Sequence, residues 1–221
     1  MSEQVDPIYV RPNRYVDSDH PEIVAFARRY DRGDPKDSAV ALFYAVRDGW
    51  RYNPYRIALE PDGYLASEVL SRPGDRGGHC IDKALLLAAA ARELGIPSRL
   101  HFADVRNHVG TAKLEAYLGT DLLVFHGYTE LFLDGRWVAT TPAFNAALCE
   151  RLGVSPLDWD GEHDAIFQEY DGDTRFMEYV EDHGSHAEIP FEAMVAAWRR
   201  HYPRIAPSAM ADLDEGAPTT G

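Results

Sequence analysis

Residues 77–97 read GGHCIDKALLLAAAARELGIP, and this stretch decides the fold. Alanine and leucine have the highest intrinsic helix propensities, so the run that begins at Cys80 predicts a helix. Gly95 suits the left-handed residue that follows a helix, and Pro97 prevents continuation. Because the segment is apolar on almost every side, we expect it to be the central buried helix.

Cys80 occupies the N-terminus of this helix, a position that favours the reactive form of a thiol. A thiol reacts as its thiolate, and the unpaired N–H groups and the dipole of a helix N-terminus stabilise that anion. Gly77 and Gly78 allow a tight turn and the close approach of a substrate, and the same N–H groups could bind an oxyanion. Most free cysteines only fill space in a core, so Cys80 alone does not distinguish a nucleophile from a packing residue.

Two strand patterns follow the helix. Residues 98–105 alternate between apolar and polar, and Leu122–Leu133 reads as a longer strand. Asp134-Gly135 predicts a two-residue hairpin, because both positions of the favoured turn need positive φ, and residues 136–141 form the return strand. The expected fold class is α+β, with a helix that begins at a cysteine packed on an antiparallel sheet.

His126 lies in the middle of the longer strand, on the face opposite most of its apolar residues. If the hairpin is tight, Leu133 pairs with Arg136, and counting back places Thr141 opposite Tyr128. Thr141 and His126 then share a face as diagonal neighbours, about 7 to 8 Å apart at the backbone. The strand pattern therefore offers His126 as a base and Thr141 as a polar group that orients it, with Asn145 as the competing orienter.

Two segments resemble the transglutaminase-like superfamily. The first is Gly78-His79-Cys80 with its alanine- and leucine-rich helix closed by Leu94-Gly95-Ile96-Pro97, and the second is HGYTELFLDGRWV over residues 126–138. Residues 38–50 are similar to the helix before the nucleophile, so the resemblance covers about residues 38–145. It implies a papain-like core, with Cys80 as nucleophile and His126 as base, and acyl transfer on a peptide, amide or thioester substrate through an acyl-enzyme.

One position departs from the family pattern. The family usually has an aspartate where this chain has Thr141, and a hydroxyl stabilises an imidazolium less than a carboxylate does. The leading hypothesis is a hydrolase of the protease or amidase type, or a transglutaminase-type acyltransferase. The alternative is a catalytically silent transglutaminase-like binding module.

Length and composition set the domain organisation. With 221 residues, the chain can bury one substantial core. We expect an extended arm over residues 1–18, a single domain over residues 19–206, and a disordered tail over residues 207–221.

Charge and composition narrow the partners. The formal net charge of -14 disfavours nucleic acid and anionic lipid as partners. Neither a leader peptide nor a long apolar run is evident, and only Cys80 and Cys149 occur, so a cytoplasmic protein is expected. The nine histidines show no metal-ligand spacing, so we expect no metal and no cofactor. The oligomeric state is left open.

Overall fold

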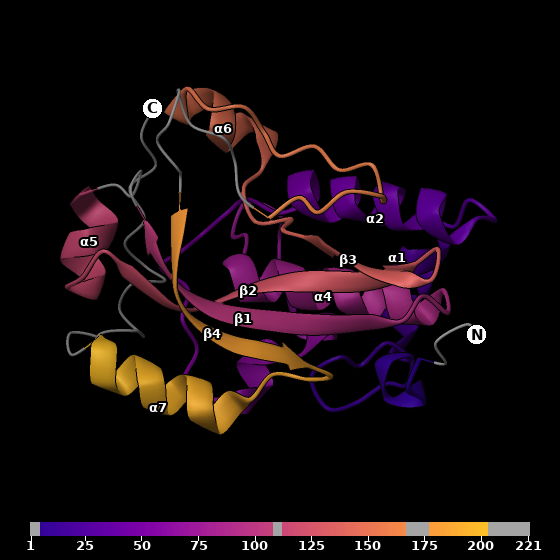
Figure 1. The fold of residues 1–221 in the computed structure, drawn as a ribbon, viewed down its shortest axis with the longest axis horizontal. Helices are drawn as coiled ribbons and strands as arrows, with labels where there is room; N and C mark the ends of the chain where they lie inside the picture. The colour runs from indigo at the N-terminus through magenta and orange to yellow at the C-terminus, as the bar shows by residue number, and fades with distance from the viewer. Residues whose placement is uncertain (1–4, 108–111, 167–176, 203–221) are drawn as a thin grey trace.

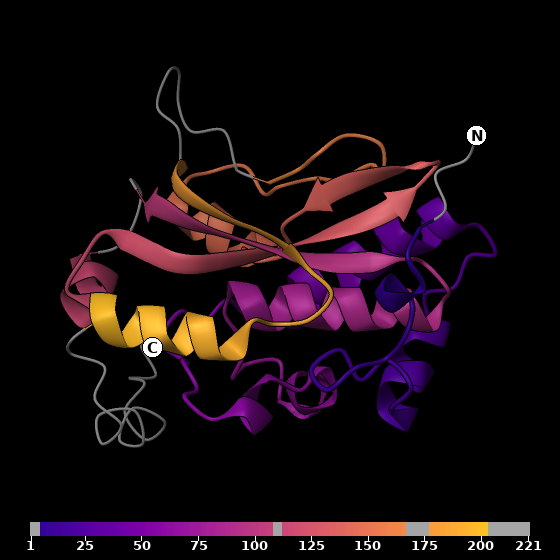
Figure 2. The same ribbon diagram turned by 60° about the horizontal axis from the view of Figure 1, so that its bottom comes forward.

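This computed structural model describes residues 5–107, 112–166 and 177–202. Four strands form one antiparallel sheet in the order β3-β2-β1-β4, which confirms the predicted α+β class. The bounds of the strands are β1 (Ser98–Asn107), β2 (Leu122–Leu133), β3 (Arg136–Thr140) and β4 (Met177–His186). Figures 1 and 2 show the twisted sheet lying along α4 (Cys80–Glu93), with further helices on the far side of α4.

The central helix is buried along nearly its whole length. All residues from Ile81 to Arg92 are buried, because the sheet covers one side of α4 and three helices cover the other. These helices are α1 (Pro21–Arg28), α2 (Pro35–Gly49) and α3 (Ala66–Ser71). The remaining helices are α5 (Ala112–Leu118), α6 (Ala146–Leu152) and α7 (Phe191–His201), with short 3-10 turns at Pro7–Tyr9 and Pro61–Tyr64.

The predicted hairpin register is confirmed. Leu133 pairs with Arg136, and the ladder continues to Thr129 opposite Thr140. β4 was not predicted, because Met177–His186 is rich in charged and polar residues and forms an edge of the sheet, where residues 178–182 are exposed.

The described N-terminal residues contact the core. Tyr15 and Val16 are buried within it. The division at residues 18 and 206 stays a prediction, and the segment 207–221 lies outside the described residues. Among the helices that the structure describes, none is long and apolar enough to cross a membrane.

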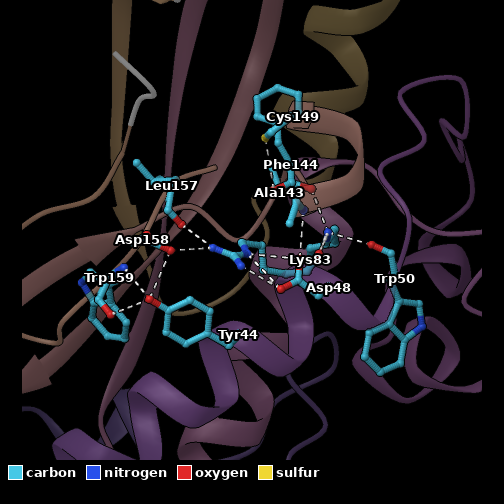
Figure 3. Close-up of polar contacts among 12 residues, drawn as sticks. Tyr44, Asp48, Trp50, Lys83, Ala143, Phe144, Cys149, Leu157, Asp158 and Trp159 are labelled. Carbon is cyan, nitrogen blue, oxygen red and sulfur yellow. Dashed lines mark hydrogen bonds and ion pairs between the residues drawn. The ribbon is translucent and has the colours of Figure 1, made fainter. Parts of the chain in front are cut away.

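A buried lysine holds two segments together that are distant in the sequence. Lys83 is fully buried, and its Nζ donates to the backbone carbonyls of Arg47 (2.8 Å), Trp50 (2.8 Å) and Ala143 (2.7 Å). Burial lowers the pKa of Lys83 to about 7, but three acceptors require three N–H donors, which only the ammonium form supplies. Figure 3 shows this lysine between Trp50 and Ala143. It therefore ties the C-terminus of α2 to the loop that follows β3.

We expect Lys83→Met to lower the free energy of unfolding by about 2 to 4 kcal/mol, because three buried carbonyls lose their donor while one buried charge is removed. Chemical denaturation measures the change. Lys113→Met, at an exposed position, is the matched control and should change stability by less than about 0.5 kcal/mol. Equal stability of the Lys83→Met variant and the parent protein would contradict this account.

Candidate active site

The N-terminus of α4 is held by a capping box that the sequence analysis missed. His79 is the N-cap, and its Nδ1 accepts the N–H groups of Ile81 (3.1 Å) and Asp82 (3.4 Å). The Asp82 carboxylate accepts the N–H of His79 in return (2.9 Å). An acidic residue three positions after a polar N-cap is the signal that could have revealed it. The cap leaves the N–H of Cys80, the first helical residue, unused by either side chain.

A buried network supports this cap. Asp82 Oδ1 pairs with Arg72 Nη1 at 3.0 Å. Since His79 Nδ1 accepts hydrogen bonds, its Nε2 carries the proton and donates to the hydroxyl of Tyr64 (3.1 Å). Gly77 has φ +64, and a Cβ there would lie 1.8 Å from the carbonyl oxygen of Arg51. The turn before Cys80 therefore requires glycine.

The thiol of Cys80 is more difficult to ionise than the sequence suggests. Burial raises its pKa to about 11, although the backbone N–H groups of Gly127 and Ile81 favour the thiolate. Loss of solvation therefore outweighs the stabilisation of the thiolate by the nearby N–H groups of the helix terminus. Cys80 is therefore a neutral thiol near pH 7.

Alkylation of Cys80 by iodoacetamide should consequently be slow at pH 7 and should rise about tenfold per pH unit until the pH approaches 11, since only the thiolate reacts. Mass spectrometry at several pH values measures the rate, and Cys80→Ala reports labelling of the buried Cys149. A plateau below pH 8 would show that the thiolate is stabilised after all.

His126 lines the same pocket as Cys80. It is only 2% exposed, and both ring nitrogens lack a hydrogen-bond partner. Burial, followed by the charge of His79, lowers its pKa to about 4, so the imidazole is neutral near pH 7. Gly127 allows β2 to approach α4, because a Cβ there would lie 3.1 Å from Ile81. The structure thus brings a neutral thiol and a neutral imidazole to one pocket.

A β-bulge lies directly before His126. β1 pairs Ala103 with His126 and Val105 with Leu123, so two residues of β2 oppose the single residue Asp104. One of the two, Phe125, has φ +57, which is rare for a residue with a bulky side chain.

Asp104 and His183 hold this bulge. The Asp104 carboxylate accepts the N–H of Phe125 at 2.9 Å and lies 2.7 Å from His183 Nε2. The ring of His183 stacks on Phe125 with centroids 4.1 Å apart. Glu181 completes the one group of three side chains within the described residues that could together hold a metal ion. The Asp104 carboxylate of this group is already bonded to the His183 imidazole and to the backbone N–H of Phe125.

Neither of the two predicted orienting residues is hydrogen-bonded to His126. Thr141 donates its N–H to the carbonyl of Ala165 (3.0 Å), while its Oγ1 is buried without a partner. Asn145 Oδ1 accepts the N–H of Tyr52 (3.1 Å), so this amide supports the pocket wall. The predicted hydrogen bond from Thr141 or Asn145 to His126 is absent from this structure.

The pocket around the pair holds about 410 Å³ of empty space, including the part open to solvent. Figures 1 and 2 show α5 and α7 at the end of the sheet where α4 begins. Both helices contribute to the lining, together with β2, the start of α4 and the loop after α2. The lining residues are Tyr52, Pro54, Ile57, His79, Cys80, Ile81, Leu114, Leu118, Leu123, Val124, Phe125, His126, Trp198 and Tyr202.

Comparison with known proteins agrees with this arrangement. The sequence pattern of the transglutaminase-like superfamily matches residues 24–142, just over half of the chain. The chain belongs to the transglutaminase-like superfamily. The match contains both segments on which the resemblance rests, and it supports a cysteine-dependent kind of enzyme. It ends before β4 and α7, so the transglutaminase-like core does not include the α7 side of the pocket.

One solved structure similar to this transglutaminase-like chain is that of a "Putative Cysteine Protease from Cytophaga hutchinsonii". The identity is 18% and the TM-score is 0.44. The similarity covers 61% of this chain and 40% of that protein, so the chain spans less than half of its length. No curated protein matches the chain.

Proposed function

We propose that this protein is a cysteine-dependent acyl-transfer enzyme that forms an acyl-enzyme on Cys80. The observation that carries the proposal is the convergence of Cys80, at a capped helix N-terminus, and His126 in one pocket of a transglutaminase-like fold. The substrate class is a peptide, an amide or a thioester. Water as acceptor makes the enzyme a hydrolase, and an amine makes it an acyltransferase.

The reaction follows from the two neutral groups. His126 removes the proton from the Cys80 thiol as the sulfur attacks the carbonyl carbon, so that the C–S bond forms while the C=O π bond becomes an oxyanion. The N–H of Cys80 donates to that oxyanion. The imidazolium then protonates the leaving amine or thiol, and the scissile bond breaks. The acceptor loses its proton to His126 as it attacks the thioester, and the imidazolium returns a proton to the Cys80 sulfur as the C–S bond breaks and the C=O bond re-forms.

Intact-mass spectrometry tests the proposal directly. The wild-type protein and Cys80→Ala are incubated with a panel of peptide amides and thioesters, and each sample is examined for a covalent adduct. We expect a mass increase equal to the acyl group in the wild type and none in the variant. An adduct of equal yield in both proteins would place the acylated group elsewhere and overturn the proposal.

A silent binding module is the second candidate. It is favoured by the raised pKa of Cys80 and by the two unpaired nitrogens of His126. Absence of any Cys80 adduct across the panel would favour this alternative.

Two free cysteines fit a reducing compartment, and the acidic net charge disfavours nucleic acid, so we place the protein in the cytoplasm and assign it no nucleic-acid or membrane partner.

Thr141 offers a matched pair of variants. Because Oγ1 has no partner, Thr141→Val should leave the acylation rate within about threefold of the parent protein and slightly increase stability. Thr141→Asp restores the family's usual carboxylate and should raise the pKa of His126, because a negative charge favours the imidazolium. NMR titration of His126 and the rate of adduct formation measure the two effects. A large loss of rate in Thr141→Val would show that the hydroxyl does orient His126.

A further inference from the structure

Among the residues that the structure describes, the lining of the pocket contains no lysine, arginine, aspartate or glutamate. Its side chains are mostly aliphatic and aromatic, with Leu114 and Leu118 from α5 and Trp198 from α7. The titratable imidazoles of His79 and His126 both have lowered pKa values because of burial, so both are neutral near pH 7. The pocket therefore offers no charge to pair with an ionised group.

Most polar atoms of the lining are already used. The hydroxyl of Tyr202 accepts the N–H of Val124 (2.6 Å) and donates to the carbonyl of Leu122 (3.3 Å). Trp198 Nε1 donates to the carbonyl of Val124 at 2.9 Å. Both nitrogens of His79 are engaged within the helix cap and with Tyr64. A polar substrate group in this pocket would lose its water and gain few new partners.

We propose that the pocket is the acyl-binding site and takes an uncharged, apolar acyl group, either branched aliphatic or aromatic. This inference rests on the proposed function, since the pocket opens on Cys80 and His126. α7 lies beyond the matched family region, so this chain's own C-terminal part forms one wall of the pocket. Leu114, Leu118 and Trp198 are then the residues that determine specificity.

Thioesters of N-acetylcysteamine test the inference by their acyl groups. Isovaleryl, phenylacetyl and succinyl thioesters are compared in the rate of adduct formation on Cys80. We expect the two apolar donors to react about 100-fold faster than the succinyl donor, because the carboxylate must give up its water without a partner. Equal rates would overturn the inference while leaving the acyl-enzyme intact.

Binding without chemistry separates the inference from the proposed function. In Cys80→Ala, quenching of tryptophan fluorescence, including that of Trp198, or calorimetry measures the affinity for isovaleramide and for succinamate. Tighter binding of isovaleramide by at least tenfold is expected even if no donor acylates the wild type, in which case only the proposed function fails. Equal affinity for the two ligands, or binding of neither, would overturn the acyl-binding site.

Variants of α5 locate the preference in the pocket wall. Leu114→Lys introduces a cation, so the succinyl donor should gain at least tenfold relative to isovaleryl. Val180→Lys, at a residue that is 52% exposed, is the matched control and should leave the ratio unchanged. Circular dichroism checks folding. If Leu114→Lys does not fold, Leu118→Ala replaces it and should shift the optimum toward longer acyl chains. An unchanged preference in the folded variant would contradict the assignment of this wall.

Discussion

His126→Asn is expected to lower the rate of Cys80 acylation by at least about 1000-fold. The thiol is protonated near pH 7, so attack on a carbonyl requires a group that removes the proton as the C–S bond forms. His126 is the imidazole that shares the pocket with the sulfur. Asparagine has a similar shape and can donate and accept hydrogen bonds, but it cannot take up a proton. Single-turnover acylation with an isovaleryl thioester measures the loss.

The same variant carries its own folding control. The pKa of His126 in the folded protein is about 4, below its ordinary value of 6.5, because burial disfavours the imidazolium. Between these two values the unfolded chain binds more protons, so His126 lowers the stability of the parent protein as the pH falls from 6.5 toward 4. His126→Asn should lose less stability across this window. An inactive variant that keeps normal stability at pH 7 and gains acid resistance would be folded but lack its base.

The parts of the site that the sequence predicts are those set by local rules. The composition of residues 80–94 determines a helix, and the glycine pair marks its beginning. The Asp134-Gly135 turn fixes the register of β2 and β3, and that register places Thr129 opposite Thr140. Strand alternation then singles out His126. Each of these inferences needs only neighbours in sequence or one tight turn.

Other properties depend on segments that meet only in the folded chain. The raised pKa of Cys80 reflects burial in a pocket that is lined partly by α5 and α7, which lie more than 30 and 110 positions away. The sequence likewise does not reveal the neighbours of His126, because the side-chain oxygen of Asn145 accepts a hydrogen bond from Tyr52 instead. A helix terminus favours a thiolate, but the sequence does not reveal that burial opposes it.

The bulge before His126 gave no sequence signal. Positive φ is usually marked by glycine, asparagine or aspartate, whereas here the residue is Phe125. Asp104 and His183 provide the contacts that hold this conformation, and they come from β1 and β4. The strand pattern of β2 alone cannot show where its pairing register with β1 shifts. Interruption of the alternation at Phe125 determines how the next side chain, His126, enters the pocket.

We therefore expect Asp104→Leu to reduce kcat for acylation by about 10- to 100-fold with little change in KM. Leucine is branched at the same position as aspartate but cannot accept the N–H of Phe125, so the strained backbone loses its support and His126 shifts relative to Cys80. Displacement of a catalytic group by about 1 Å is enough for such a loss. The acyl-binding wall of α5 and α7 does not use Asp104, which is why KM should remain close to that of the parent.

Asp104→Asn distinguishes positioning from general stability. Its Oδ1 can still accept the N–H of Phe125, and its amide can face His183, so most of kcat should return. Asp121→Leu, at a partly exposed carboxylate paired with Arg106, controls for the loss of an acidic residue. If Asp104→Leu and Asp104→Asn lose the same activity, or if Asp104→Leu loses stability but not kcat, Asp104 serves the fold alone. If kcat is retained in Asp104→Asn but not in Asp104→Leu, the hydrogen bond to Phe125 positions His126, because only asparagine keeps an acceptor for that N–H.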